Sequence, residues 1–274
     1  MNILLLSYGN ESSIEIAKSI NELNNHVVYG CHWDTVNAGL AYLNANYVLQ
    51  IPNPYEIGHF SYFIGVIDGL IEQKNIDRVY VTNCKLLKLV FENYSEFKHI
   101  DKFLIPSRKQ LEYCLYKDKL YELVPEVSPT IFKSTIEAIQ AGVDEIFIKP
   151  KYGSSGTGTR LSIDVDEIDS LTDDEMACEY LPNEEFTVDC VSDSDGTLKD
   201  FNVRVRTRIR DGICNVGKST DEQYDAIATA LQLITQRLPL PHHWFAQFKL
   251  DVRGTPKLLE INSRISGSFC ITKS

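Results

Sequence analysis

Residues 203–210 alternate apolar or uncharged side chains with arginines without a break, in the stretch VRVRTRIR. Successive residues of a β-strand point to opposite faces of its sheet, so this strand has one face lined with guanidinium groups. Such alternation is typical of an antiparallel strand with one solvated face, whereas a buried parallel strand reads as a nearly continuous apolar run. We therefore predict an antiparallel sheet in this part of the chain.

The residues that follow, GICNVGKST at 212–220, match the phosphate-loop pattern G-x-x-x-x-G-K-[ST] at every position. A phosphate loop of this kind needs a buried parallel strand before it and a helix N-terminus after it. The strand before Gly212 is half exposed instead, and too few residues follow Gly217 to complete such a domain. We interpret the match as a hairpin turn at 211–212, and leave open that Lys218 and the nearby arginines face an anion.

The first third of the chain has a different pattern, because apolar strand-like runs alternate there with helical periodicity. The predicted strands are 3–7, 26–31, 78–82 and 102–105, and the predicted helices are 12–23, 62–74 and 85–94. Strands that alternate with helices predict a parallel, doubly wound sheet.

From residue 145 onward, the pattern predicts mainly antiparallel structure. The predicted strands are 145–149, 176–181, 186–191, 197–209, 244–252 and 257–262, with one helix at 221–236. We therefore predict two domains, 1–110 and 111–274, of α/β and α+β type respectively.

Composition excludes several classes of partner. A net charge of −11 argues against nucleic acid and membrane surfaces, although a few basic residues can still form one positive pocket. The seven cysteines include no C-x-x-C pair, which favours free thiols over a disulfide framework or a zinc site. No apolar segment has the length of a bilayer span, and the start lacks the basic region of a signal peptide. We expect a soluble, cytoplasmic protein.

A second glycine-rich segment, FIKPKYGSSGTGTRLSI, occupies residues 147–163. Lys149 ends an apolar strand, so its ammonium group projects where the chain enters the loop. The glycines allow the backbone to approach a ligand closely, and Ser154, Ser155 and Thr157 offer hydroxyl and N–H donors to phosphate oxygens. The same pattern also fits an ordinary turn between two strands.

The C-terminal stretch FAQFKLDVRGTPKLLEINSR, residues 245–264, has the residue types of a magnesium site. Glu260 and Asn262 share one face of a strand, and a turn brings Gln247 beside them on the preceding strand. Their carboxylate and amide oxygens are ligands that Mg²⁺ prefers. Arg264 continues this face and would place positive charge beside a transferring phosphoryl group. A half-exposed strand with polar residues outward is the alternative.

Taken together, these segments resemble the ATP-grasp superfamily, in the branch of biotin carboxylase and the large subunit of carbamoyl-phosphate synthase. The similarity extends over essentially the whole chain, and EINSR at 260–264 is its most specific motif. The matching segments are LNANYVLQIP at 43–52, YKDKLYELV at 116–124, IFIKPKYGSSGTGT at 146–159 and CEYLPNEEFTVDCVSDSDG at 178–196. The resemblance implies a Rossmann-like preATP-grasp domain, then an ATP-grasp domain of two α+β subdomains with a hinge near 180–184.

The resemblance also implies roles for individual residues. It implies that Lys119 and Lys149 are the two lysines that contact ATP. It also implies that the backbone near 179–181 binds the adenine and that Glu185 binds the ribose. The implied nucleotide-binding set is Lys119, Lys149, Ser154, Ser155, Gly156, Thr157, Glu179, Tyr180, Leu181 and Glu185. The implied metal ligands are Gln247, Glu260 and Asn262, and the implied catalytic residues are Arg264 and Lys149.

The function implied by the resemblance is an ATP-dependent carboxylate–amine or carboxylate–thiol ligase that works through an acyl phosphate. Its cofactor would be Mg²⁺, with Mn²⁺ as a substitute, and its substrates would be a small-molecule carboxylate and an amine. A homodimer is left open as its assembly. Two alternatives stay open, namely a kinase acting on a small-molecule acceptor and a nucleotide-binding module without turnover. Arg204, Arg206 and Arg208 are candidates to bind a substrate carboxylate, or are simply solvated.

Two departures from the family pattern stand out. Family members continue for some tens of residues past N-x-R-x-S-G, whereas this chain stops at Ser274, so we expect truncation or a fold that closes without its last helix. The first turn, SYGN, has one glycine and no G-x-G-x-x-G motif, which disfavours a Rossmann-type oxidoreductase.

Overall fold

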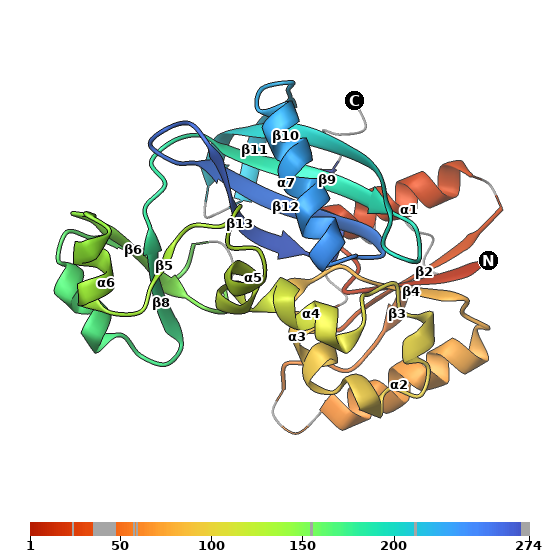
Figure 1. Cartoon of the computed structure of the whole chain (residues 1–274). Helices are drawn as coiled ribbons and strands as arrows, with labels where there is room; N and C mark the ends of the chain where they lie inside the picture. Colours follow the sequence, from red (N-terminus) through yellow and green to blue (C-terminus); the bar gives the residue numbers. More distant parts are fainter. Residues whose placement is uncertain are drawn as a thin grey trace. The chain divides into compact units, whose positions relative to one another are not determined.

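A computed structural model of the chain describes residues 1–23, 25–34, 48–56, 58, 60–153, 156–210 and 213–269. The chain divides into two compact units (Figure 1). The first unit comprises Met1–Arg108 and the described residues from Arg264 onward, and the second comprises Lys109–Ser263. None of the helices in the described ranges has the length and apolar character that a membrane crossing requires, and the six cysteines described there are free thiols.

The first unit contains a parallel four-stranded sheet in the order β3-β2-β1-β4, as the sequence pattern predicted. The central strand β1 is almost fully buried, which explains its unbroken apolar run. The strands are β1 (Asn2–Leu6), β2 (Val27–His32), β3 (Val48–Gln50) and β4 (Arg78–Val81), and the main helices are α1 (Glu11–Glu22), α2 (Phe60–Gln73) and α3 (Cys84–Glu92).

The predicted strand at 102–105 is wrong. Ile100–Lys102 forms a short 3₁₀ helix, and Phe103 makes only an isolated parallel bridge to Val79. Phe103 is buried against Phe97, so its apolar character reflects packing in the core and not membership of the sheet.

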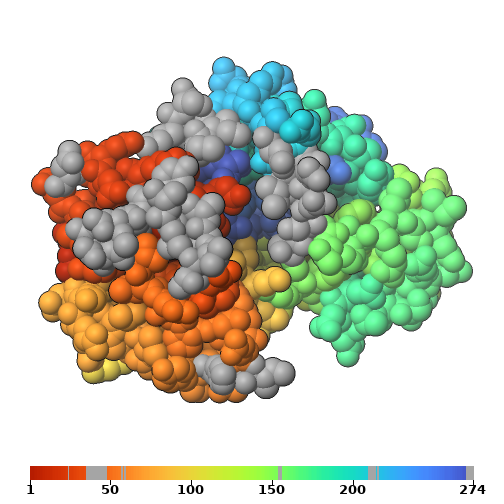
Figure 2. Space-filling view, turned by 180° about the vertical axis from the view of Figure 1, so that it is seen from behind, coloured from red at the N-terminus to blue at the C-terminus, as the bar shows by residue number. Residues whose placement is uncertain are grey.

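The second unit contains two antiparallel sheets, so the predicted combination of a parallel sheet with α+β structure is confirmed. The five-stranded sheet has the order β11-β10-β9-β12-β13, with β9 (Glu185–Ser192), β10 (Leu198–Arg210), β11 (Ile213–Ser219), β12 (His242–Leu250) and β13 (Pro256–Asn262). The four-stranded sheet has the order β5-β8-β6-β7, with β5 (Ile131–Phe132), β6 (Ile146–Pro150), β7 (Arg160–Ser162) and β8 (Glu175–Glu179). With α6 (Thr135–Gln140) it forms a lobe of its own, drawn in green in Figures 1 and 2.

The alternating arginine stretch lies in β10, which pairs with β9 on one side and with β11 on the other. Val203 and Val205 are buried in the core, and Arg204 and Arg206, which alternate with them, face the opposite side of the sheet. Residues 213–219 of the phosphate-loop match form strand β11, with Gly217 opposite Arg206. The antiparallel pairing that such a hairpin requires is therefore confirmed, and the predicted turn at 211–212 lies outside the described residues.

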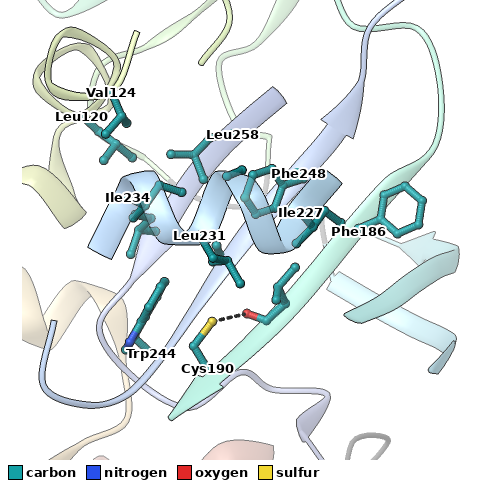
Figure 3. Close-up of a cluster of buried hydrophobic side chains, with 14 of the residues drawn as sticks. Leu120, Val124, Phe186, Cys190, Ile227, Leu231, Ile234, Trp244, Phe248 and Leu258 are labelled. Atoms are coloured by element: carbon teal, nitrogen blue, oxygen red, sulfur yellow. Dashed lines mark hydrogen bonds between the residues drawn. The ribbon is translucent and has the colours of Figure 1, made fainter. Parts of the chain in front are cut away.

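One face of the five-stranded sheet is covered by α7 (Tyr224–Arg237), which packs an apolar stripe onto it (Figure 3). Leu120 of the short helix α5 (Lys117–Leu123) and Val124 just after it add further apolar side chains near Leu258 in β13. The most buried members of this core include Leu120, Phe186, Ile227, Leu231, Ile234, Trp244, Phe248 and Leu258. Because this face is apolar, the polar side chains of the same strands gather on the other face.

Gly196 in the turn between β9 and β10 is a position that only glycine fits. Its φ is +88°, and a Cβ atom there would lie 2.4 Å from the carbonyl carbon and oxygen of Pro239. We expect Gly196→Ala to lower the free energy of unfolding by about 2–5 kcal/mol, because strain and overlap with backbone add together. Urea denaturation measures this loss.

Gly254 provides a matched control, since its φ is +78° but a Cβ atom there would meet nothing within 4 Å. Gly254→Ala should lower the free energy of unfolding by only about 1 kcal/mol, the strain of a side chain at positive φ. Equal losses at the two glycines would show that the contact with Pro239 contributes nothing.

Candidate functional site

The second unit contains a cavity of about 220 Å³ whose lining comes from both of its antiparallel sheets, from α5 and from the loop after β6. Four of its charged lining residues are basic and two are acidic, although the chain as a whole carries a net charge of −11. The charged set is Lys117, Lys149, Glu185, Arg206, Lys249 and Glu260. This excess of positive charge favours a small anionic ligand.

Lys149 in β6 is the most unusual residue of the cavity, because its side chain is charged and only 5% exposed. Its Nζ donates a hydrogen bond of 2.7 Å to Tyr121 Oη and lies 4.7 Å from the centre of the Tyr121 ring. No ion pair joins Lys149 to a carboxylate within the described ranges. A buried cation without a counter-ion is costly, and an anion bound in the cavity would neutralise it.

A second lysine in the cavity is Lys117, the first residue of α5. Its Nζ donates a 2.8 Å hydrogen bond to the carbonyl oxygen of Gly153 and lies 3.6 Å from Glu260 Oε2. Its side chain is 15% exposed and that of Glu260 is 22% exposed. Lys117 therefore connects the glycine-rich loop to the strand that carries the predicted metal ligands.

Lys119, which the resemblance implied as the first ATP lysine, is not among the residues that line this cavity. It forms an ion pair with Glu112 on the surface, where its side chain is 45% exposed, and its Nζ lies 5.5 Å from the centre of the Tyr116 ring. Residues two apart on a helix are rotated by roughly 200°, so Lys117 and Lys119 point to nearly opposite sides of α5. Tyr116 is extended and α5 begins at Lys117. The start of the helix therefore decides which of the two lysines faces the cavity.

The three predicted metal ligands lie on one face of β12 and β13. Gln247 is the cross-strand partner of Glu260, and Asn262 Nδ2 donates a 2.9 Å hydrogen bond to Glu260 Oε1. Gln247 and Glu260 line the cavity. Side-chain oxygens of this kind suit Mg²⁺.

This ligand set is incomplete by itself. Among the described residues, no group of three or more His, Cys, Asp or Glu side chains is arranged to hold a metal ion. One carboxylate and two amides bind a divalent ion weakly, and Mg²⁺ at such sites takes further oxygens from phosphates and water. The set therefore fits a metal ion that binds together with an anionic ligand.

Glu185, at the start of β9, forms an ion pair with Arg206 Nη1, which also donates a 3.3 Å hydrogen bond to Gln247 Oε1. The neighbouring Arg204 is fully buried, and its Nε and Nη2 both lie 2.8 Å from Asp189 Oδ2. Arg208 is exposed. Two of the three arginines considered for a substrate carboxylate thus have carboxylate partners within the protein.

The predicted adenine segment adjoins the cavity through Phe147. Tyr180 stacks on the Phe147 ring with 6.2 Å between centroids, and Lys249 Nζ lies 6.0 Å from the Tyr180 ring centre. Glu179 ends β8 and accepts the backbone N–H of Thr130 at 3.2 Å, and Leu181 is buried. Phe147, Lys249 and Tyr121 had no sequence signal as site residues, since apolar and isolated basic residues of this kind are common in strands and helices.

The glycine-rich loop contributes Gly153, Gly156, Thr157 and Thr159 to the cavity. Gly156 has a φ of +69°, and Gly158 has a φ of +76° with Pro150 Cγ only 3.0 Å from the position of an added Cβ. The positive φ favours glycine at both positions, and at Gly158 the close Pro150 side chain disfavours any larger residue further. Ser154 and Ser155 lie outside the described residues.

Arg264, the implied catalytic arginine, belongs to the first unit. Its Nε lies 2.9 Å from Cys84 Sγ, and its Nη1 donates a 2.9 Å hydrogen bond to the carbonyl oxygen of Ile265. Its proximity to a reacting group stays a prediction.

A family model described as "ATP-grasp in the biosynthetic pathway with Ter operon" matches residues 172–274. No protein of curated function matches the sequence. The structure is similar to the biotin carboxylase domain of 2-oxoglutarate carboxylase from Hydrogenobacter thermophilus, solved with MgADP and bicarbonate, with a TM-score of 0.77 and 14% identity over 99% of this chain and 66% of that one.

Two further solved structures are similar over nearly the whole chain. Biotin carboxylase from Campylobacter jejuni gives a TM-score of 0.73 and 17% identity, covering 99% of this chain and 67% of that one. L-amino acid ligase from Bacillus licheniformis gives a TM-score of 0.68 and 14% identity, covering 98% and 68%. The chain therefore has the ATP-grasp fold, as its motifs predicted, and spans about two thirds of the length of these proteins.

Proposed function

We propose that this ATP-grasp chain is an ATP- and magnesium-dependent ligase that joins a small-molecule carboxylate to an amine or a thiol through an acyl phosphate. The observation that carries the proposal is Lys149, a buried cation whose described partners are all neutral, on the wall of a positively charged cavity. A triphosphate would supply the missing negative charge.

Lys117 and Lys149 are the residues that we assign to the phosphates. The resemblance implied Lys119 as the first of the two lysines that contact ATP. We assign this role to Lys117 instead, because Lys117 lines the cavity beside the glycine-rich loop and Glu260. Two lysines from different elements would neutralise two phosphate groups while leaving the terminal one accessible.

Glu260, Asn262 and Gln247 would hold the magnesium ion. When bound, the ion would neutralise charge that develops on the phosphate oxygens during transfer. The contact between Lys117 and Glu260 balances the charge of this carboxylate in the structure described here.

The nucleoside would lie at the other end of the cavity. The backbone at 179–181 would bind the adenine beside the stacked rings of Phe147 and Tyr180, and Glu185 would bind the ribose. The ion pair with Arg206 fixes the Glu185 carboxylate. The loop residues Ser154, Ser155, Gly156 and Thr157 would donate hydrogen bonds to the phosphates.

The reaction would proceed in two balanced steps. A carboxylate oxygen of the substrate attacks the γ-phosphorus, and the bond to the β-phosphate oxygen breaks to release ADP. The amine or thiol then attacks the acyl carbon, phosphate leaves, and the nucleophile loses its proton. We propose that Arg264 stabilises the transferring group, and that the chain supplies mainly placement and electrostatics.

Incubation with ATP, Mg²⁺ and pools of small acids, amino acids and thiols tests this proposal. Release of ADP together with an amide or thioester supports it. ADP with a phosphorylated acceptor that persists would identify a kinase instead, and nucleotide binding without ADP release would identify a module without turnover.

Lys218 provides a test of the rejected phosphate-loop interpretation. It lies in strand β11, opposite Val205, outside the lining of the cavity. We expect Lys218→Ala to leave the Kd for MgATP, measured by calorimetry, within about twofold, because Lys218 is exposed and salt screens the charge of an exposed side chain outside the cavity. A loss of tenfold or more would place phosphates at this hairpin.

A further inference from the structure

We propose that Tyr121 is a positioning residue that holds the Lys149 ammonium group toward the cavity without neutralising its charge. The inference rests on the proposed function, because it concerns the lysine that we assign to the ATP phosphates. Tyr121 lies in α5 and is only 1% exposed. It belongs to the matched segment 116–124, but the resemblance implied no role for it.

The directions of the two hydrogen bonds at the Tyr121 hydroxyl follow from chemistry. The oxygen lies 2.8 Å from the carbonyl oxygen of Leu259, which can only accept, so the phenol proton is donated there. The oxygen is then left as an acceptor for Lys149 Nζ at 2.7 Å. Burial raises the pKa of Tyr121 well above its usual value, so the hydroxyl keeps this proton at physiological pH.

The partners of Lys149 differ from those of a structural lysine. Besides the Tyr121 hydroxyl, its ammonium group contacts the Tyr121 ring and interacts with the buried thiol of Cys178. These groups are neutral, so they orient the ammonium group while its full charge stays available to a ligand. A carboxylate in the place of Tyr121 would compete with the phosphate for this charge.

Tyr121 also connects the two halves of the site. Lys149 lies in β6 of the four-stranded sheet, whereas Leu259 precedes the metal ligand Glu260 in β13 of the five-stranded sheet. A single hydroxyl therefore fixes the position of the phosphate lysine relative to the strand of the metal ligand. Its loss should loosen this spacing and weaken the binding of MgATP.

A double-mutant cycle tests the inference on the full chain, with the Kd for MgATP measured by calorimetry. Tyr121→Phe keeps the ring and removes only the hydroxyl, and we expect it to weaken binding about tenfold, the effect of one hydrogen bond to a charged group. Lys149→Met should weaken binding about 100-fold. In the Lys149→Met background the hydroxyl has no lysine to hold, so the Kd of the double variant should equal that of Lys149→Met within about twofold.

Each other outcome has a defined meaning. An unchanged Kd for Tyr121→Phe, or an equal loss in the Lys149→Met background, would overturn the positioning role, since a merely structural hydroxyl would act in both backgrounds. An unchanged Kd for Lys149→Met would overturn the proposed function itself. Tyr80→Phe in the first unit, a half-buried tyrosine, is the control and should change the Kd less than twofold.

A second variant covers the case in which Tyr121→Phe does not fold. Site-specific 3,5-difluorotyrosine at position 121 keeps both hydrogen bonds but makes the phenol oxygen a weaker acceptor. We expect weaker MgATP binding with Lys149 present and no change in the Lys149→Met background. The same Kd with and without fluorine in the presence of Lys149 would overturn the inference.

Discussion

Glu260→Ala should reduce metal-dependent ADP release by at least about 100-fold, the effect of removing one preorganised charged contact from a transition state. Glu260 offers the one carboxylate of the predicted metal set, and its cross-strand partner Gln247 and its hydrogen-bonded neighbour Asn262 are neutral amides. The variant would leave Mg²⁺ with amide oxygens only from this set, and it would also remove the carboxylate that lies 3.6 Å from Lys117 Nζ. Steady-state ADP release as a function of Mg²⁺ concentration measures the effect.

The control for this variant is Glu222→Ala, because Glu222 is exposed next to α7 and does not line the cavity. It should keep turnover within about twofold of the unmodified chain. Turnover of Glu260→Ala at more than a tenth of the original rate, with the fold intact by circular dichroism, would remove Glu260 from the metal site.

Lys117→Ala and Lys119→Ala form the second decisive comparison, because the two lysines lie two residues apart on the same short helix. Lys117→Ala should weaken MgATP binding by about 10- to 100-fold, since it removes a charged donor from the cavity. Lys119→Ala removes a surface ion pair with Glu112 and should change the Kd less than twofold. Calorimetric titration of both variants under the same conditions measures the difference.

The opposite ranking would restore the assignment implied by the resemblance, in which Lys119 contacts the phosphates. If both variants changed the Kd for MgATP less than twofold, neither lysine would contact the phosphates. The proposed site would then lose one of its two phosphate-binding lysines.

The architecture followed from the sequence wherever periodicity was pronounced. The arginine alternation in 203–210 predicted an antiparallel strand with a solvated basic face, and β10 is antiparallel to both of its neighbours. Its basic face is not solvated throughout, because Arg204 is fully buried against Asp189 and the Arg206 side chain is only 6% exposed. The apolar run after Met1 likewise predicted the buried central strand β1. The strand expected at 102–105 failed because a short apolar run has the same composition whether it pairs in a sheet or only packs in a core, as Phe103 does.

The site was predictable only where residues two apart on a strand fix a common face. That rule placed Glu260 and Asn262 together, and the hairpin register brought Gln247 opposite Glu260. The choice between Lys117 and Lys119 depends instead on where a seven-residue helix begins, and a shift of one residue there rotates a side chain by about 100°.

Tyr121 illustrates a different limit of sequence reasoning. Its role arises from contacts with Lys149 and Leu259, which are 28 and 138 residues away in the chain, and no local pattern encodes such contacts. The acceptor substrate is harder still to predict, because loops build such pockets without periodic residues.

A structure of the chain bound to Mg²⁺ and a non-hydrolysable ATP analogue tests the central claim most directly. The account predicts that the triphosphate occupies the cavity of the second unit, with Lys117 and Lys149 against its oxygens and the metal ion bound by Glu260. Phosphates bound at the β10–β11 hairpin near Lys218, or a nucleotide elsewhere with Lys149 untouched, would contradict it.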